Sequence, residues 1–184
     1  AARFLWRPET NDANLLIALS GHGDEYLLRD RYLAGWAIDV GAHIGGVTVP
    51  LLLDNPQLRV VAVEAMPENV DVLRQNLERN GVIDRAVVVD AAATGPGVDA
   101  VRVSWGYRSW SDGKTTHADD YVHAHRLIGN QYRHEGDPTY TIRVPGVSLG
   151  DVLDRFGIED VEFLKIDCEG CEWEFLTDPA VARV

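Results

Sequence analysis

The alternation of short apolar runs with helix-like segments between residues 36 and 93 is the feature that most constrains this fold. Apolar runs rich in β-branched residues predict strands at residues 36–40, 58–65 and 85–93. Helices are predicted between them, the first of which tolerates Pro50 only in its first turn. Strand, helix, strand, helix, strand is typical of a parallel sheet with helices on its faces. The sequence therefore predicts an α/β fold.

The second of these helices has clear signals at both ends. Pro67 stands at a position that is favoured at the start of a helix. Val70, Leu73 and Leu77 recur at three- and four-residue steps, which predicts that they form one buried face. Gly81 is predicted to end the helix as its C-terminal cap.

The rest of the chain continues this pattern after an irregular middle segment. Further strands are predicted at residues 101–105, 139–147 and 161–167, and a helix follows Ser148, which suits an N-cap. We expect one domain over residues 1–184. Its parts are a cofactor-binding half at 35–93, a substrate lid or insert at 105–138 and an active-site region around the fourth strand at 147–184.

Composition is that of a globular protein and argues against two kinds of partner. Of the 184 residues, 46% are hydrophobic and 25% are charged, and no apolar run approaches the ~20 residues that span a bilayer. The start of the chain lacks the basic-then-apolar order of a signal peptide. The formal net charge of −12 argues against nucleic acid, because phosphates are bound by Lys and Arg. We expect a cytoplasmic protein with no nucleic-acid or membrane partner, and a homo-oligomer stays open.

The stretch "DVGAHIGG", residues 39–46, follows the first strand and opens the first helix. Its pattern, D-x-G-x-x-x-G, differs from the G-x-G-x-x-G of dinucleotide sites. Gly41 and Gly45 let the backbone turn tightly and approach a ligand closely. A helix N-terminus favours an anion such as a carboxylate, and Asp39 suits a cationic amino group. A ligand that has both groups is an amino acid.

Two further acids end the next two strands. Glu64 can accept hydrogen bonds from ribose hydroxyls, and Asp90 can accept one from an adenine amino group. Together with the glycine turn, these positions suit an amino acid joined to a nucleoside, which describes S-adenosyl-L-methionine. Its cationic sulfonium agrees with an acidic pocket. The alternative is an α/β domain with an empty glycine turn.

Several segments make the chain resemble the FkbM-type family of S-adenosylmethionine-dependent methyltransferases over roughly residues 36–177. They are "IDVGAHIGGVTVPLL", "VVAVEAMPENVDVLRQNLERNG", "VVVDAAATG", "VSLGDVLDRFGIEDVEFLKID" and "CEGCEWEFL". The resemblance implies a Rossmann-like class I methyltransferase fold, mostly parallel with helices on both faces, and methyl transfer that is typically to a hydroxyl oxygen. Further strands follow "CEGCEWEFL" in that fold, so we expect its C-terminal strands to be missing from this chain.

The resemblance also implies roles for individual residues. Those implied to bind the cofactor are Asp39, Gly41, His43, Gly45, Glu64, Met66, Asp90, Ala91 and Asp167. The glycine turn would frame the methionine part, Glu64 would hold the ribose, and Met66 would lie along the adenine face. Asp167 would lie beside the reacting methyl group. The family usually has Asn where this chain has His43, and Asn is common where it has Asp90.

Asp167 ends the fourth predicted strand and Glu169 lies in the turn after it. One hypothesis makes either residue the base that takes the proton of the acceptor hydroxyl, or the group that orients this hydroxyl. A second makes both of them ligands of Mg²⁺, an ion that is chemically possible here but not expected. A third is that Glu169 and Glu172 only cap the next helix. His43 is a further candidate base near neutral pH, although a lone His more often packs or forms hydrogen bonds.

The same stretch contains a C-x-x-C pair, Cys168 and Cys171. A structural zinc site needs four ligands and no second C-x-x-C exists. The pair could be a redox dithiol if it lay at a helix start after a strand. We favour the interpretation of the sulfurs as small buried apolar groups, with a reactive Cys171 at a helix start left open. Lys165 either pairs with a carboxylate or extends its ammonium to solvent.

The predicted function is methyl transfer from S-adenosylmethionine to a hydroxyl of a small molecule by in-line displacement. The acceptor classes implied are a sugar, a glycosylated natural product, and a polyketide or peptide intermediate. Residues 105–138 are expected to form much of the acceptor pocket, with Tyr107 and Trp110 as contacts, or else to be a partly disordered loop. The alternative functions are a nicotinamide-dependent oxidoreductase and a non-catalytic cofactor-binding module.

Overall fold

The computed structural model describes residues 1–8, 10, 12–21, 26, 32–106, 114–116, 139–168 and 170–184. In chain order its elements are α1 (Asp12–Gly21), β1 (Gly35–Val40), α2 (Thr48–Asp54), β2 (Leu58–Glu64), α3 (Pro67–Arg79), η1 (Ile83–Arg85), β3 (Ala86–Asp90), β4 (Ala92–Ala93), β5 (Ala100–Gly106), β6 (Lys114–Thr116), β7 (Thr139–Val147), α4 (Leu149–Phe156), β8 (Phe163–Ile166), α5 (Glu172–Leu176) and η3 (Pro179–Arg183). The predicted pocket contacts Tyr107 and Trp110, and most of the predicted lid at 105–138, lie outside the described residues.

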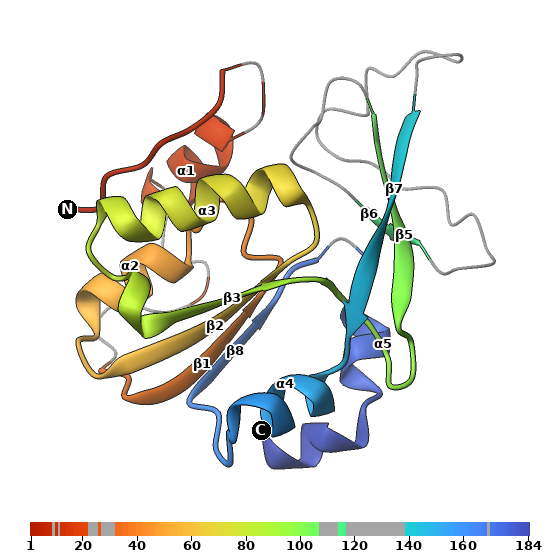
Figure 1. Ribbon diagram of the computed structural model, residues 1–184. Helices are drawn as coiled ribbons and strands as arrows, with labels where there is room; N and C mark the ends of the chain where they lie inside the picture. Colours follow the sequence, from red (N-terminus) through yellow and green to blue (C-terminus); the bar gives the residue numbers. More distant parts are fainter. Residues whose placement is uncertain are drawn as a thin grey trace.

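The central sheet has the order β3-β2-β1-β8, and all its paired strands are parallel (Figure 1). Its register aligns the carboxyl ends of the strands: Glu64 pairs with Asp90, and Val40 pairs with both Val63 and Ile166. This confirms the predicted α/β fold with a parallel sheet. It also brings the acids that were predicted at successive strand ends to one edge of that sheet.

Helices cover both faces of the central sheet, because side chains along each strand point alternately to opposite faces. On β2, Val60 and Ala62 pack with residues of α2 and α3, whereas Val61 and Val63 pack with residues of α4 and α5. Figure 1 shows α2 and α3 on one side of the sheet and α4 on the other. Burying each such aliphatic side chain stabilises the fold by about 1.5–3 kcal/mol.

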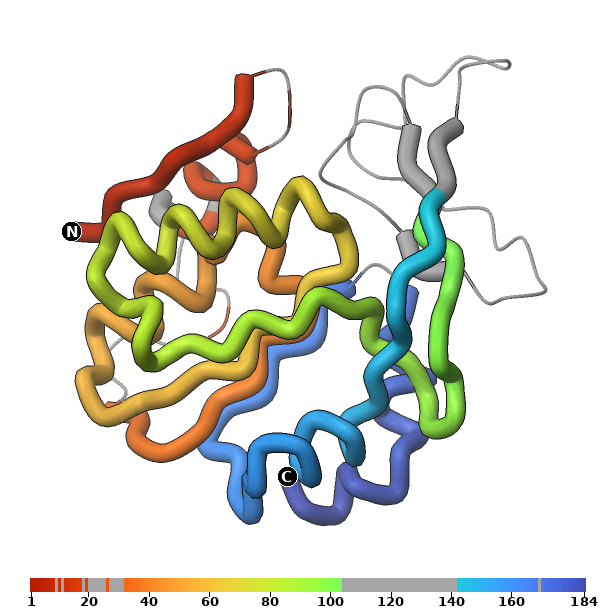
Figure 2. The backbone as a smooth tube through the Cα atoms, in the orientation of Figure 1, coloured from red at the N-terminus to blue at the C-terminus, as the bar shows by residue number. Residues whose placement is uncertain are grey.

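A second sheet, of order β4-β7-β5-β6, lies beside the central one (Figure 2). Its β5 and β7 are antiparallel over the whole length of β5, and its inner face packs Val101, Val103 and Val144 against Met66. The single strand predicted at 85–93 was wrong. The chain turns after Asp90, and β4 then pairs with β7 instead of extending the central sheet.

The predicted helix ends are confirmed in detail. Pro67 is the first residue of α3. At the other end, Gly81 adopts a positive φ of 67°, its N–H donates to the Glu78 carbonyl, and the next N–H donates to the Leu77 carbonyl. These two bonds form a Schellman motif. Ser148 caps α4 in a reciprocal capping box with Asp151.

The N-terminal segment, which the sequence left unassigned, lies along α3. Asn76 of α3 is fully buried, accepts a hydrogen bond from the Leu5 N–H, and donates to the carbonyls of Leu5 and Ile44. Asn80 exchanges a similar pair of bonds with Arg3. None of the helices within the described residues has the length and apolar character needed to cross a bilayer.

Candidate functional site

The candidate site is the carboxyl edge of the central sheet, where the turns after β1, β2 and β8 meet. Gly41, His43 and Gly45 have positive φ values of 74°, 51° and 91°, so the turn after β1 uses three residues with positive φ. A Cβ at Gly41 would overlap the backbone carbonyl oxygen of Asp167. Only glycine therefore permits the turn after β1 to lie this close to the turn after β8.

Asp39 lies underneath this turn and is fully buried. Its Oδ2 accepts a 2.6 Å hydrogen bond from the Thr48 hydroxyl, and its Oδ1 lies 3.1 Å from the Lys165 ammonium. Lys165 also donates to the carbonyls of Val40 and Gly41. The prediction that Lys165 pairs with a carboxylate is confirmed. The structure thus gives Asp39 a cationic partner inside the protein, and its contact with a ligand stays a prediction.

Glu64 is held at the end of β2 by three donors. Oε1 accepts from the Met66 N–H at 2.9 Å and from Asn69 Nδ2 at 3.1 Å, and Oε2 accepts from the His43 N–H at 2.8 Å. Burial raises the pKa of Glu64, although these hydrogen bonds act in the opposite direction. A carboxylate oxygen can accept two hydrogen bonds. Oε2, with one donor among the described residues, therefore keeps an acceptor position for a hydroxyl.

His43 is packed against the N-terminal segment, with its Nε2 3.6 Å from Asp12 Oδ1. Burial lowers the pKa of His43 to about 4, despite the opposing effect of the Asp12 carboxylate. The imidazole is therefore neutral at pH 7. A base with this pKa has little driving force to take a hydroxyl proton, so the geometry favours a structural role for His43 in the turn.

Asp167 is exposed at the end of β8 and accepts a 3.1 Å hydrogen bond from the Tyr26 hydroxyl. Its backbone lies against Gly41 of the glycine turn, and its predicted position beside the reacting methyl group stays a prediction. Glu169 lies outside the described residues. Glu172 accepts bonds from the N–H groups of Cys168 and Gly170, so it stabilises the turn before α5, although no side chain caps the N-terminus of that helix among the described residues. Within the described part of the chain, no cluster of three or more His, Cys, Asp or Glu side chains could hold a metal ion.

The two cysteines form a disulfide bond, Cys168–Cys171, across the turn before α5. Their interpretation as two separate apolar groups was therefore wrong. Cys171 is buried in the core with Phe175, and Cys168 packs against the same cluster. The turn after β8 thus brings the two sulfurs together. The disulfide closes the turn that follows Asp167.

The predicted adenine-side residues follow β2 and β3. Met66 is buried, and Ala91 is buried with its N–H bonded to the Glu64 carbonyl. Asp90 is exposed and forms a 2.8 Å ion pair with Arg74. The structure thus brings Glu64, Met66 and Ala91 together, while Asp90 lies at the rim of this edge.

Residues 39–184 match the methyltransferase FkbM domain. The chain belongs to the FkbM methyltransferase family. The family resemblance predicted from the sequence is thereby confirmed. A curated relative, the methyltransferase sdnD of Sordaria araneosa, is 28% identical over 155 residues, which are 76% of this chain and 58% of the relative. The chain thus spans less than two thirds of that relative's length.

Solved structures show weaker similarity to this FkbM-family chain. TYW2 of Pyrococcus horikoshii, in complex with MeSAdo, is 18% identical, with a TM-score of 0.34 over 49% of this chain and 30% of its own. A precorrin-6y C5,15-methyltransferase of Geobacter metallireducens is 22% identical, with a TM-score of 0.35 over 49% of this chain and 44% of its own. At these TM-scores the similarity indicates nothing about the site of this chain beyond its own contacts.

Three residues of the FkbM-family site were missed by sequence reasoning. Arg7 donates through Nε and Nη2 to the two carboxylate oxygens of Asp12, and Nη2 also donates to Asn69 Oδ1 at 2.7 Å. Although burial alone would raise it, the hydrogen bonds from Arg7 keep the pKa of Asp12 below its usual value. One signal was present in the sequence: Asn69 adjoins the predicted buried stripe of α3, and a buried amide needs partners.

Proposed function

We propose that this protein is an S-adenosylmethionine-dependent methyltransferase that methylates a hydroxyl of a small molecule by in-line displacement. The observation that supports this most is the placement of Glu64 within an FkbM domain. Its carboxylate is fixed at the carboxyl edge of the sheet. Glu64 directly follows the last pair of the β1–β2 register, so it lies next to the glycine turn that follows β1. With one donor among the described residues, Oε2 keeps an acceptor position.

The residues present fit the proposed cofactor. Glu64 would accept a hydrogen bond from a ribose hydroxyl, and the turn containing Gly41 and Gly45 would adjoin the amino acid part. Met66 and Ala91 offer apolar surface for adenine, and Asp90 lies at the rim, where it can accept from an amino group. When bound, the cofactor would supply an electrophilic methyl group on a sulfonium.

Asp167 is the residue proposed to handle the acceptor's proton. Asp167 is exposed, and its backbone carbonyl lies against Gly41. Tyr26 donates to Oδ2, and among the described residues no donor contacts Oδ1, which is proposed to accept from the acceptor hydroxyl. As the hydroxyl oxygen would form its bond to the methyl carbon, the bond from that carbon to the cofactor's sulfur would break and release a neutral thioether. The hydroxyl proton would pass to Asp167, so the acceptor would leave as a neutral ether. Glu169 stays a second candidate for this role, and a Mg²⁺-assisted route through both acids is the less favoured hypothesis.

The acceptor classes proposed are a sugar, a glycosylated natural product, and a polyketide or peptide intermediate, handled in the cytoplasm. A net charge of −12 supports a neutral or cationic acceptor over nucleic acid. The family membership supports methyl transfer, and the choice of oxygen as the acceptor atom rests on Asp167 being placed to take a proton.

Calorimetry with S-adenosylhomocysteine and NAD tests the cofactor. We expect binding of the former and none of the latter, and the reverse result would establish the oxidoreductase alternative. Glu64→Gln should weaken binding of S-adenosylhomocysteine, while Glu68→Gln, an exposed position in the first turn of α3, should not.

Single-turnover assays on a panel of hydroxyl acceptors, followed by a methyl mass shift, test the chemistry. Asp167→Asn should slow methyl transfer at saturating cofactor by about 10²–10⁴-fold, the range typical of a lost general base. An unchanged single-turnover rate in Asp167→Asn would exclude Asp167 as the base. Loss of activity on EDTA dialysis would favour the metal route. Cofactor binding without turnover of any acceptor in the panel would favour a non-catalytic module.

A further inference from the structure

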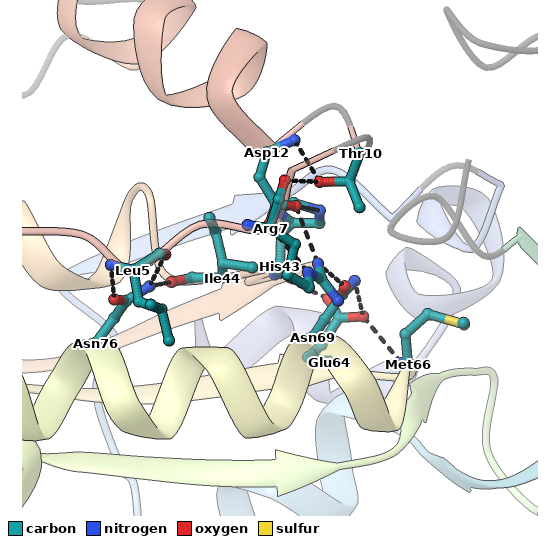
Figure 3. Close-up of polar contacts among 10 residues, drawn as sticks. All are labelled: Leu5, Arg7, Thr10, Asp12, His43, Ile44, Glu64, Met66, Asn69 and Asn76. Atoms are coloured by element: carbon teal, nitrogen blue, oxygen red, sulfur yellow. Dashed lines mark hydrogen bonds and ion pairs between the residues drawn. The ribbon is translucent and has the colours of Figure 1, made fainter. Parts of the chain in front are cut away.

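A closed polar network joins the N-terminal segment to the candidate cofactor site (Figure 3). Its members are Arg7, Asp12, His43, Glu64 and Asn69. Arg7 bonds to Asp12 and Asn69, Asn69 bonds to Glu64, Glu64 bonds to the backbone of His43, and the His43 ring lies against Asp12. Each member therefore contacts two others. Arg7 and Asp12 precede residue 39, where the family match begins.

Arg7 determines which way the Asn69 amide points. A guanidinium can only donate hydrogen bonds, so the 2.7 Å contact with Arg7 Nη2 requires the Asn69 oxygen on that side. The amide nitrogen must then face Glu64, to which it donates at 3.1 Å. With the amide reversed, the Asn69 oxygen would face the Glu64 carboxylate and two acceptors would oppose each other.

Asp12 fixes the Arg7 guanidinium that orients the Asn69 amide. Its two oxygens accept 2.9 Å bonds from Arg7 Nε and Nη2, and Oδ2 also accepts from the Arg7 backbone N–H. Such a two-point pairing holds the guanidinium plane in one orientation. Because the Asp12 side chain is fully buried, the pair is shielded from the solvent that weakens surface ion pairs.

We propose that Arg7 and Asp12 are positioning residues for the ribose-binding carboxylate, acting on Glu64 through the Asn69 amide. This inference rests on the proposed function of Glu64 in cofactor binding. The N-terminal segment is then part of the cofactor site although none of its residues needs to touch the cofactor. Loss of Arg7 removes the donor that orients the Asn69 oxygen, which weakens the bond from the Asn69 amide to Glu64 Oε1 and leaves Oε2 less well placed for a ribose hydroxyl.

The pH dependence of cofactor binding follows from the same contacts. Burial raises the pKa of Glu64, and the Asn69 amide is one of the groups that lowers it. The charged groups around Glu64 are Lys165 from β8 and Arg7 with Asp12 from the N-terminal segment, and His43 beside it is neutral at pH 7. Cofactor binding should weaken as pH falls through the pKa of Glu64, and without Arg7 this midpoint should move to higher pH.

Arg7→Met is the main test, and Arg3→Met is its matched control. Arg3 lies in the same segment, and its hydrogen bonds within the described residues go to Asn80 and the Arg79 carbonyl, away from Glu64. We expect Arg7→Met to weaken S-adenosylhomocysteine binding about tenfold or more, the effect of one lost hydrogen bond to a charged group, with a higher pH midpoint. KM for the methyl donor should rise while kcat at saturation stays near its original value. Arg3→Met should change neither.

Asn69→Ala gives a second, independent reading of the same relay. It should cause the same loss of affinity, and the double variant should lose little more than either single one, because both changes break one path. If Arg7→Met does not fold, Arg7→Lys and Asn69→Ala decide: Lys keeps the charge but not the two-point pairing, so affinity should still fall. Equal affinity and an unshifted midpoint in the folded variants would overturn the inference.

Wild-type binding separates this inference from the proposed function. If the wild-type protein does not bind S-adenosylhomocysteine, the proposed function fails and this inference fails with it. If the wild type binds and the Arg7 variants bind equally well, only the positioning role is lost.

Discussion

Replacing Lys165 by Met should destabilise the protein far more than breaking a surface ion pair. In the wild type the ammonium lies 3.1 Å from Asp39 Oδ1 and donates to the carbonyls of Val40 and Gly41 at 3.2 and 2.8 Å. The Lys165 and Asp39 side chains are only 5% and 0% exposed. The Met side chain has a similar length but no donor, so Asp39 would keep one partner, the Thr48 hydroxyl.

The expected loss is about 3–5 kcal/mol, the range for removing one member of a buried ion pair. The matched control is Arg183→Met, which breaks a pair with Asp154 whose side chains are 40% and 75% exposed; such pairs contribute about 0–1 kcal/mol. Urea unfolding at pH 7, followed by circular dichroism, measures both. For a chain of this size, 1 kcal/mol corresponds to roughly 2–4 °C in Tm.

The double variant Lys165→Met with Asp39→Asn sharpens this test. Removing the carboxylate's charge leaves no uncompensated charge in the core, so the double variant should be more stable than Lys165→Met alone. The reasoning would be refuted if Lys165→Met cost no more than Arg183→Met, or if the second substitution added a full further loss.

Three other predictions follow from local geometry. Gly41→Ala should lower the free energy of unfolding more than Gly97→Ala does. Both positions have a positive φ, which costs about 1–2 kcal/mol for Ala, but of the two only a Cβ at Gly41 would meet backbone atoms, at about 1–3 kcal/mol more. Equal losses in urea unfolding would contradict this. Because the raised pKa of Glu64 makes its ionised form unfavourable in the folded state, stability should decrease as pH rises from the unfolded pKa through the folded one; Glu64→Gln should remove this slope in urea unfolding at different pH values and should also lose cofactor affinity. Reducing the Cys168–Cys171 disulfide, which closes a loop of about four residues, should cost about 2 kcal/mol, whereas two thiols titrating in protein kept without reductant would show that the bond does not form.

The helix boundaries could be predicted because their signals lie within a few residues of the boundary. Pro67, Gly81 and Ser148 act through the first or last turn of their own helix. The strand at 85–93 failed for the opposite reason. Its apolar composition continues past Asp90 without interruption, and only the pairing of Ala92 with Gly146, far along the chain, shows that it enters a second sheet.

The location of the site was also predictable, whereas the partners of its residues were not. Glu64 and Asp167 had to meet the glycine turn, because parallel strands end at the same edge of a sheet. The prediction assigned Asp39 a cationic partner from a ligand, and the structure supplies Lys165 instead. Either a cationic ligand group or Lys165 would satisfy the buried Asp39 carboxylate, and the sequence alone does not distinguish these two partners. His43 looked like a base because its burial cannot be seen in the sequence. That burial is a property of the fold, and it lowers the pKa of His43 to about 4.

The polar residues of α3 explain why the N-terminal segment belongs to this site. Asn69 and Asn76 are seven residues apart, two turns of helix, and both are fully buried. A buried amide left without partners costs about 1–3 kcal/mol, so each requires polar groups from a neighbouring segment. Leu5 supplies them to Asn76 and Arg7 supplies a donor to Asn69. Within the FkbM domain, Ile44 and Glu64 accept from the two amide nitrogens, whereas the two amide oxygens accept from donors that precede residue 39. A relative with apolar residues at both positions should therefore have no equivalent of Arg7.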